Sequence, residues 1–163
     1  KTLYKYFGKK EDLVRSSFLV FFNRIEIEIA EIANRYKNPV EQLWYASDLA
    51  IKKLSEINPT SIKELKQYHQ NIYLEIVEIR NNFVRKMVRQ NISSGIELGY
   101  FRQEIPIEFI SEVFSNELLQ ITQKMASRET HFEPILIKSL IEYHVRGIAS
   151  QQGQEAVLQY FKK

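Results

Sequence analysis

The chain has 163 residues and a net charge of +3, with 44% hydrophobic and 26% charged residues, a balance typical of one globular domain and not of a disordered chain. It contains no cysteine, which excludes disulfide bonds and thiolate metal sites. No apolar run reaches the ~18 residues that span a bilayer, and no secretory signal opens the sequence, so we expect a cytoplasmic protein without membrane contact.

The first 24 residues carry the whole positive charge excess. They contain six basic and two acidic side chains, a balance of +4, whereas the rest of the chain contains 17 and 18, a balance of −1. Such an asymmetry suits contact with a polyanion, although a solvated basic tail would show the same balance.

Residues 2–13 read as a short aromatic helix, a glycine, a basic pair and the start of a long helix. Leu3 and Phe7 are four residues apart, so both would face inward and dock the short helix on the protein. A short helix can present side chains to base edges in the major groove, but an ordinary aromatic helix end would have the same pattern. The side chains directed towards DNA would be Thr2, Tyr4 and Lys5.

Three helices are predicted in the next part of the chain. Apolar residues that recur every three or four positions predict a helix over about 10–36. An Asn-Pro pair at 38–39 supplies an N-cap and a first-position proline for a helix over about 40–57. A second Asn-Pro pair, at 58–59, ends that helix and precedes a short one over 61–67.

The second half of the chain continues the helical pattern. A long helix is expected over 70–98, with Gly99 as its C-terminal stop. Pro106 and Pro134 open two further helices, and Gly153 interrupts the chain before a short amphipathic piece. We expect about nine helices in all, counting the short N-terminal one, and no sheet, because neither period-2 alternation nor a hairpin turn is present.

The N-terminal pattern resembles the end of the helix-turn-helix in the TetR family of transcription regulators. The residues that carry this resemblance are Thr2-Leu3-Tyr4-x-Tyr6-Phe7-x-x-Lys10-Glu11-x-Leu13. In that family they form the recognition helix and the start of the helix that links the head to the body. The stretch Gly-Ile-Glu-Leu-Gly-Tyr-Phe-Arg at 95–102 is similar to the end of the family's long seventh helix. Elsewhere the similarity is one of layout alone.

The resemblance implies an all-α, multi-helix bundle in two parts. Residues 1–9 would be the remnant of the DNA-binding helix-turn-helix, and residues 10–163 the ligand-binding and dimerisation domain. The earlier helices would lie upstream, so operator DNA would be a partner of the full-length protein only. The implied function is that of a ligand-responsive transcriptional regulator, a repressor released from its operator by a small, largely apolar molecule.

The resemblance implies which residues of this sequence would contact DNA. Tyr4, Tyr6 and Lys10 would contact phosphates, whereas Thr2 and Lys5 would face the groove. The positive charge excess of this end agrees with these roles.

The resemblance places a ligand pocket among the helices at 10–36, 40–57, 70–98 and 106–125. The pocket residues that we predict are Trp44, Asp48, Tyr73 and Phe83, with His69 at the rim. Each of them could instead belong to the core or the surface. Asp48 could anchor a polar or cationic group of the ligand, or it could be a solvated surface residue.

The helices near 106–125 and 132–149 are predicted to form a homodimer. The second of them is apolar around more than half of its circumference, so one face can pack on its own subunit and the other on a partner. In the resemblance, these two helices from each subunit form a four-helix bundle. The predicted interface residues are Phe114, Leu118, Ile121, Ile137, Ile141 and His144, the histidine being structural.

No enzyme activity is expected. The sequence has no Gly-x-Ser-x-Gly, no phosphate-binding glycine loop and no His-Glu-x-x-His, and no histidine follows a glutamate by three residues, as a di-iron bundle requires. We therefore expect no catalytic residue, metal or cofactor. The alternative function is a helical protein-interaction scaffold, which would share the fold but have no closed pocket for a small molecule.

Overall fold

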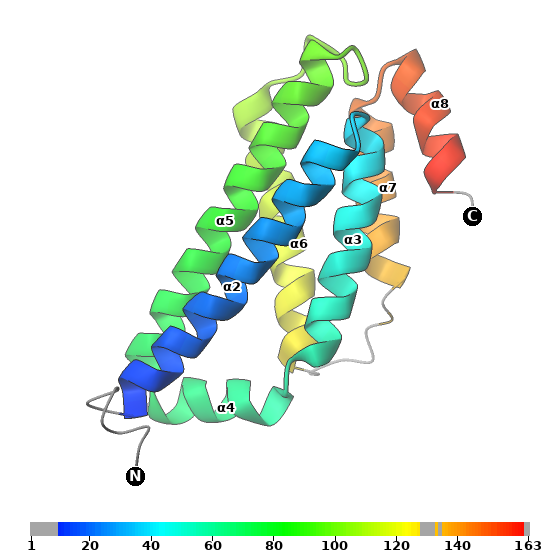
Figure 1. The fold of residues 1–163 in the computed structure, drawn as a ribbon. Helices are drawn as coiled ribbons and strands as arrows, with labels where there is room; N and C mark the ends of the chain where they lie inside the picture. The colour runs from blue at the N-terminus through cyan, green and yellow to red at the C-terminus, as the bar shows by residue number, and fades with distance from the viewer. Residues whose placement is uncertain (1–9, 128–132, 134, 162–163) are drawn as a thin grey trace.

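The computed structural model describes residues 10–127, 133 and 135–161, which form an all-helical bundle (Figure 1). Its helices are α2 (Lys10–Arg35), α3 (Pro39–Glu56), α4 (Pro59–Tyr68), α5 (Gln70–Glu97), α6 (Ile107–Ser127), α7 (Ile135–Ile148) and α8 (Gln151–Tyr160). Within the described residues there is no strand, only an isolated bridge between Phe101 and Ala149. The predicted all-α fold is therefore confirmed, while the short N-terminal helix of the prediction lies outside these residues.

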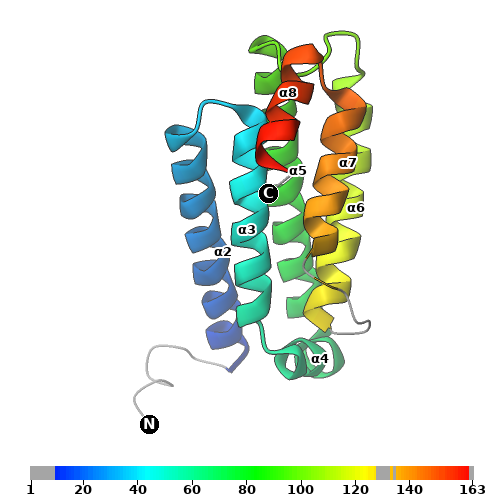
Figure 2. The same cartoon turned by 90° about the vertical axis from the view of Figure 1, so that its right-hand side faces the viewer.

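The bundle has two distinct ends. Helices α2, α3, α5, α6 and α7 run side by side along its length (Figures 1 and 2). Helix α4 lies across one end, which we call the α4 end, and α8 packs against α3 and α7 at the other, the α8 end. None of the described helices is long and apolar enough to cross a membrane.

Helix boundaries fall at the predicted N-cap Asn38 and the predicted stop Gly99, while α4 begins at Pro59, two residues before its predicted start at 61. Asn38 Oδ1 accepts hydrogen bonds from the backbone N–H groups of Val40 and Glu41 at 2.9 and 3.4 Å, and begins α3. Asn58 does the same for α4, accepting from Thr60 N–H at 3.0 Å. Gly99 ends α5 with a left-handed φ of 78°, which glycine adopts without steric cost.

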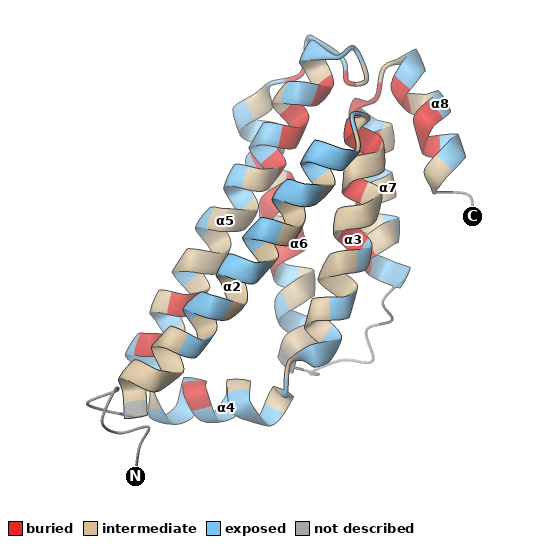
Figure 3. Cartoon of the chain, in the orientation of Figure 1, coloured by how far each residue is buried: buried red, intermediate tan, exposed pale blue. Residues whose placement is uncertain are grey.

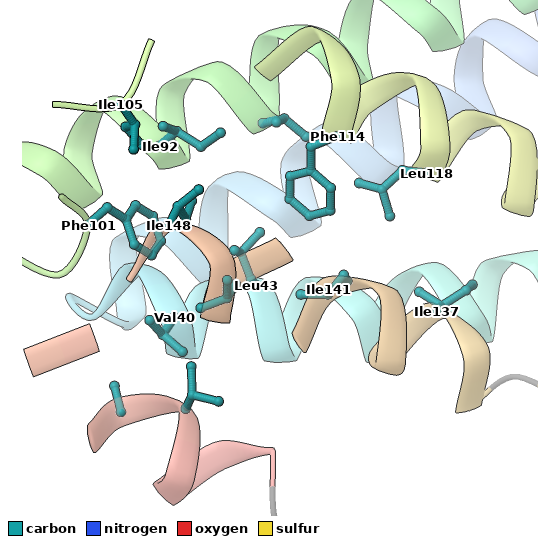
Figure 4. Packing of buried hydrophobic residues seen from close by; sticks show 14 residues of the cluster. Val40, Leu43, Ile92, Phe101, Ile105, Phe114, Leu118, Ile137, Ile141 and Ile148 are labelled. Atoms are coloured by element: carbon teal, nitrogen blue, oxygen red, sulfur yellow. The ribbon is translucent and has the colours of Figure 1, made fainter. Parts of the chain in front are cut away.

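The main hydrophobic core extends from the α8 end to the middle of the bundle (Figures 3 and 4). Its largest fully buried side chains are Phe101 and Phe114, each only 1% exposed. The buried members of the cluster are Val40, Leu43, Val88, Ile92, Phe101, Ile105, Phe114, Leu118, Ile137, Ile141, Val145, Ile148, Ala156 and Val157. They come from α3, α5, α6, α7, α8 and the α5–α6 connection, so this core joins most of the elements.

Two glycines allow close packing at the α8 end. A Cβ atom at Gly95 would clash with the ring of Phe101, and a Cβ atom at Gly153 would clash with the backbone carbonyl of Tyr100. The prediction that Gly153 interrupts the chain is wrong, because α8 begins at Gln151 and runs through this glycine. Gly153 is needed because α8 lies directly against the α5–α6 connection, a contact that periodicity along the chain does not reveal.

A smaller core lies at the α4 end. Leu65 of α4 is buried with Ile72 and Ile76 of α5, and aromatic residues of α2 pack against the three. Arg15 of α2 also donates a hydrogen bond from Nε to Glu75 Oε2 of α5 at 2.9 Å, so the start of α2 is tied to α5.

Candidate functional site

An apolar cavity of about 210 Å³ lies at the α4 end, between α2, α3, α4, α5 and α6. Helix α2 contributes a run of aromatic and aliphatic side chains, and α5 contributes residues spaced by three or four, so that one face of each helix is turned inward. The apolar lining consists of Phe18, Phe21, Phe22, Ile25, Ile29, Ala46, Leu49, Ala50, Leu54, Ile57, Ile62, Leu65, Ile76, Val77, Phe83, Val84, Met87 and Ala126. Helix α4, which lies across the end of the bundle (Figure 2), contributes Ile62, Lys63, Leu65 and Lys66 to the lining of this cavity.

The polar residues that line the cavity are either neutral or basic. Tyr73, Thr122 and Gln123 are its neutral polar residues, and no acidic residue lines it. The basic lining residues are Lys53, Lys63, Lys66 and Arg80. The cavity therefore has a positive electrostatic character in otherwise apolar surroundings.

Two of these basic residues differ in their partners. Lys53 Nζ lies 2.6 Å from Glu28 Oε1, and this hydrogen bond raises the pKa of Lys53. Arg80 donates hydrogen bonds from Nε and Nη2 to Asn81 Oδ1, at 3.3 and 3.1 Å. This amide oxygen is a neutral acceptor. Burial lowers the pKa of Arg80 from its ordinary value, because an apolar environment disfavours the charged form.

A second, more polar hollow of about 710 Å³ adjoins this cavity further along α2, α3 and α5. Its lining includes Gln42, Gln90 and Asn91, and Asn91 Nδ2 donates to the backbone carbonyl of Pro39 at 3.0 Å. The two hollows share the lining residues Ile29, Ala46, Phe83 and Met87. The smaller one is the better candidate for a small apolar molecule, because its walls are mostly hydrophobic.

The structure brings together two of the predicted pocket residues, Tyr73 and Phe83, which both line the apolar cavity. His69 is not among the lining residues. It ends α4 and precedes α5, with its Nδ1 3.5 Å from Glu11 Oε1 at the start of α2.

Trp44 and Asp48 lie outside the cavity, on another side of α3. The ring of Phe161 stands edge-on to Trp44, with 5.0 Å between centroids, and Lys138 Nζ lies 3.7 Å from the Trp44 ring centre. The same Nζ is 2.6 Å from Asp48 Oδ1, so Asp48 forms a partly exposed ion pair with α7. The physical reason is helical spacing: Ala46, Ala50 and Lys53 line the cavity, which turns positions 44 and 48 to the opposite face.

Sequence reasoning missed Arg80 and the α2 aromatics as site residues. The signal for Arg80 is its place on the apolar stripe of α5, four residues after Ile76 and three before Phe83. A charged residue in such a position faces the core or a cavity. The signal on α2 is the density of aromatic residues at 18–22, more than one packing face needs.

The predicted DNA-binding residues fall at the edge of the structure. Thr2, Tyr4, Lys5 and Tyr6 lie outside the described residues, and Lys10 is the first residue of α2. These residues therefore stay a prediction from the sequence.

The predicted dimer residues belong largely to the chain's own core. Phe114, Leu118, Ile137 and Ile141 are all buried within the single chain, and Ile121 packs against the same cluster. His144 Nε2 donates to Glu117 Oε2, and its ring centre is 4.4 Å from that of Phe114, so it links α7 to α6. Four of the six predicted interface residues are therefore core residues of the subunit, because both faces of α7 are apolar and periodicity does not distinguish them; the dimer itself stays a prediction.

Comparisons with known proteins add no relative to this description. No family model, no curated protein and no solved structure matches the chain. Among the described residues there is also no cluster of histidine and acidic side chains that could hold a metal ion.

Proposed function

We propose that the chain is the ligand-binding and dimerisation part of a TetR-like transcription regulator, a repressor that a small, largely apolar molecule releases from its operator. The observation that carries this proposal is the position of the apolar cavity against α2. Helix α2 begins at Lys10, inside the motif that resembles the DNA-binding head, and it lines the cavity from Phe18 to Ile29. A molecule bound in the cavity would touch the helix that carries the head.

The first turns of α2 are tied to the helices that enclose the cavity. Arg15 hydrogen-bonds to Glu75 of α5, and Glu11 lies beside His69 between α4 and α5. With 26 residues, α2 is a rod of about 39 Å, so a small shift near the cavity is carried towards the head. A coupling of ~1–3 kcal/mol, typical of allosteric proteins, is sufficient for such a switch.

The test uses the protein extended upstream to a complete helix-turn-helix. Its operator is selected from random palindromic DNA, and release is followed by fluorescence anisotropy with 1-octanol and octanoate as probes. Phe83→Trp should fill the cavity and prevent release by either probe, while operator affinity in the absence of probe is unchanged. Tyr68→Trp, at an exposed site on α4, is the matched control and should respond like the parent. Release of the Phe83→Trp variant at the parental probe concentration would contradict the proposal.

We also propose a homodimer through the outer faces of α6 and α7. Phe109 and Tyr143 are 62% and 72% exposed, unusual values for aromatic residues. Leu136, Leu140 and Tyr143 follow each other at spacings of four and three, so they share one face of α7. A second copy of the chain is the expected occupant, because a two-fold axis would place this face against itself.

Two glutamate substitutions on α7 separate the inner face from the outer one. Tyr143→Glu should dissociate the dimer and leave helicity unchanged, whereas Ile141→Glu should unfold the subunit because a charge is buried in its core. Light scattering measures the mass and circular dichroism the fold. A monomeric parent at micromolar concentration would refute the dimer.

A further inference from the structure

The walls of the apolar cavity contain one half-buried cation that has no carboxylate partner among the described residues. Of the 25 lining residues four are basic and none is acidic. Lys53 is paired with Glu28, and Lys63 and Lys66 are exposed on α4. Arg80 is half-buried on α5, and among the described residues it forms no ion pair. A ligand would have to supply the negative charge that the described residues do not place beside Arg80.

The surroundings of Arg80 make an uncompensated charge unfavourable. It stands between Ile76 and Phe83 on the stripe of α5 that faces the cavity. A guanidinium has five N–H donors, and the hydrogen bonds described for Arg80 use Nε and Nη2 on the single oxygen of Asn81. Burying a cation costs free energy unless it is paired, so an anion entering this cavity would remove that cost. The planar guanidinium matches a carboxylate through two parallel hydrogen bonds.

We propose that the ligand of this cavity is a small amphipathic carboxylate, with its anionic head on Arg80 and its aliphatic or aromatic body among the α2 aromatics. This inference rests on the proposed function only for the use of the cavity as a ligand site. The volume of about 210 Å³ exceeds the ~150 Å³ that accommodates benzene and lies below the ~300–1,000 Å³ of drug-sized sites. A medium-chain fatty acid or an arylalkanoic acid has the required size and charge.

Calorimetric titration of the 163-residue chain tests the proposal with probes that share one alkyl chain. Octanoate should bind more tightly than 1-octanol, and octylamine should not bind. Arg80→Met should weaken octanoate roughly ten- to a hundredfold, the usual effect of losing hydrogen bonds to a charged group, and should leave 1-octanol binding unchanged. Arg80→Lys should retain part of the octanoate affinity, because the charge is kept and the bidentate geometry is lost.

Arg85→Met is the matched control, since Arg85 is exposed on the same helix and does not line the cavity. This variant should bind octanoate like the parent. Thermal unfolding without a probe should show that Arg80→Met is at least as stable as the parent, because an unpaired cation has been removed from an apolar site.

Three results would overturn the carboxylate assignment: no octanoate binding to the parent, equal affinity for octanoate and 1-octanol, or equal losses in Arg80→Met and Arg85→Met. The operator assay separates this inference from the proposed function. Octanoate that binds through Arg80 without releasing DNA contradicts the proposed regulator and supports the carboxylate site. Release of DNA by 1-octanol alone, with no role for Arg80, supports the proposed regulator and contradicts the carboxylate site.

Discussion

The two ends of the bundle differ in how they use their apolar residues. At the α8 end, side chains from six segments form one continuous core around Phe101 and Phe114, whereas the buried cluster described at the α4 end consists of Leu65, Ile72 and Ile76 (Figure 3). The aromatic residues of α2 at this second end surround a cavity instead of filling it. The comparison indicates that stability is concentrated at the α8 end, which leaves the α4 end free to hold a ligand.

The buried polar groups of the two ends differ in charge. At the α8 side they are neutral: Ser115 Oγ donates to Ser111 O at 2.6 Å and Asn91 Nδ2 donates to Pro39 O at 3.0 Å, while Asn91 Oδ1 and Ser111 Oγ have no hydrogen-bond partner among the described residues. At the α4 end, Arg80 meets only a neutral amide oxygen. An unpaired neutral oxygen costs less free energy to bury than an unpaired cation, so the α4 end is the one that an anionic ligand would complete.

A glycine substitution at the packed end is expected to have one of the two largest effects on stability. Gly153→Ala should destabilise the chain by about 3 kcal/mol or more, because the new methyl group meets the backbone of Tyr100, which cannot rotate away as a side chain can. Gly147→Ala is the control, since a Cβ atom there meets nothing within 4 Å and alanine favours a helix by ~1 kcal/mol. Urea unfolding measures both. Equal stability of the two variants would show that α8 is not held as tightly as its packing indicates.

A matched pair of truncations compares the two ends directly. Phe114→Ala should cost ~3–5 kcal/mol, because it opens a new cavity in a filled core. Phe83→Ala should cost about 1–2 kcal/mol, because this ring already borders an empty space and loses fewer contacts. The free energies of unfolding of the two variants and the parent are measured by the same denaturant titration. If the order is reversed, the α4 end contributes more to stability than its burial indicates.

The helix boundaries could be predicted from the sequence because their signals are local. The Asn-Pro pairs at 38–39 and 58–59 and the glycine at 99 each affect the backbone within about one helical turn. The sequence predicts a helix boundary at each of them, and the structure has one there. Two of the predicted pocket residues, Tyr73 and Phe83, line the apolar cavity, because they lie on the side of α5 that carries its apolar stripe.

The faces of α3 and α7 could not be predicted in this way. Both helices are apolar around much of their circumference, so periodicity does not say which neighbour meets which side. Trp44 therefore packs with Phe161 and Lys138 and not in the cavity, and Ile141 is in the core while Tyr143 is outside. The close contact of Gly153 with Tyr100 depends on residues about fifty positions apart, which no local pattern contains.

The smallest expected effect concerns the helix caps at the two ends. Asn38 begins α3 next to the fully buried Val40, so Asn38→Ala should lower the free energy of unfolding by ~1 kcal/mol in a global transition. Asn58 begins α4, whose only buried residue is Leu65, so losing its cap should open α4 locally with little change in the global midpoint. Hydrogen exchange distinguishes the two outcomes: Asn58→Ala should speed exchange within α4 alone, and Asn38→Ala should speed exchange throughout the main core. Equal protection of α4 in both variants would mean that the α4 end unfolds together with the rest of the bundle, and the cavity would then lie in a region as rigid as the core.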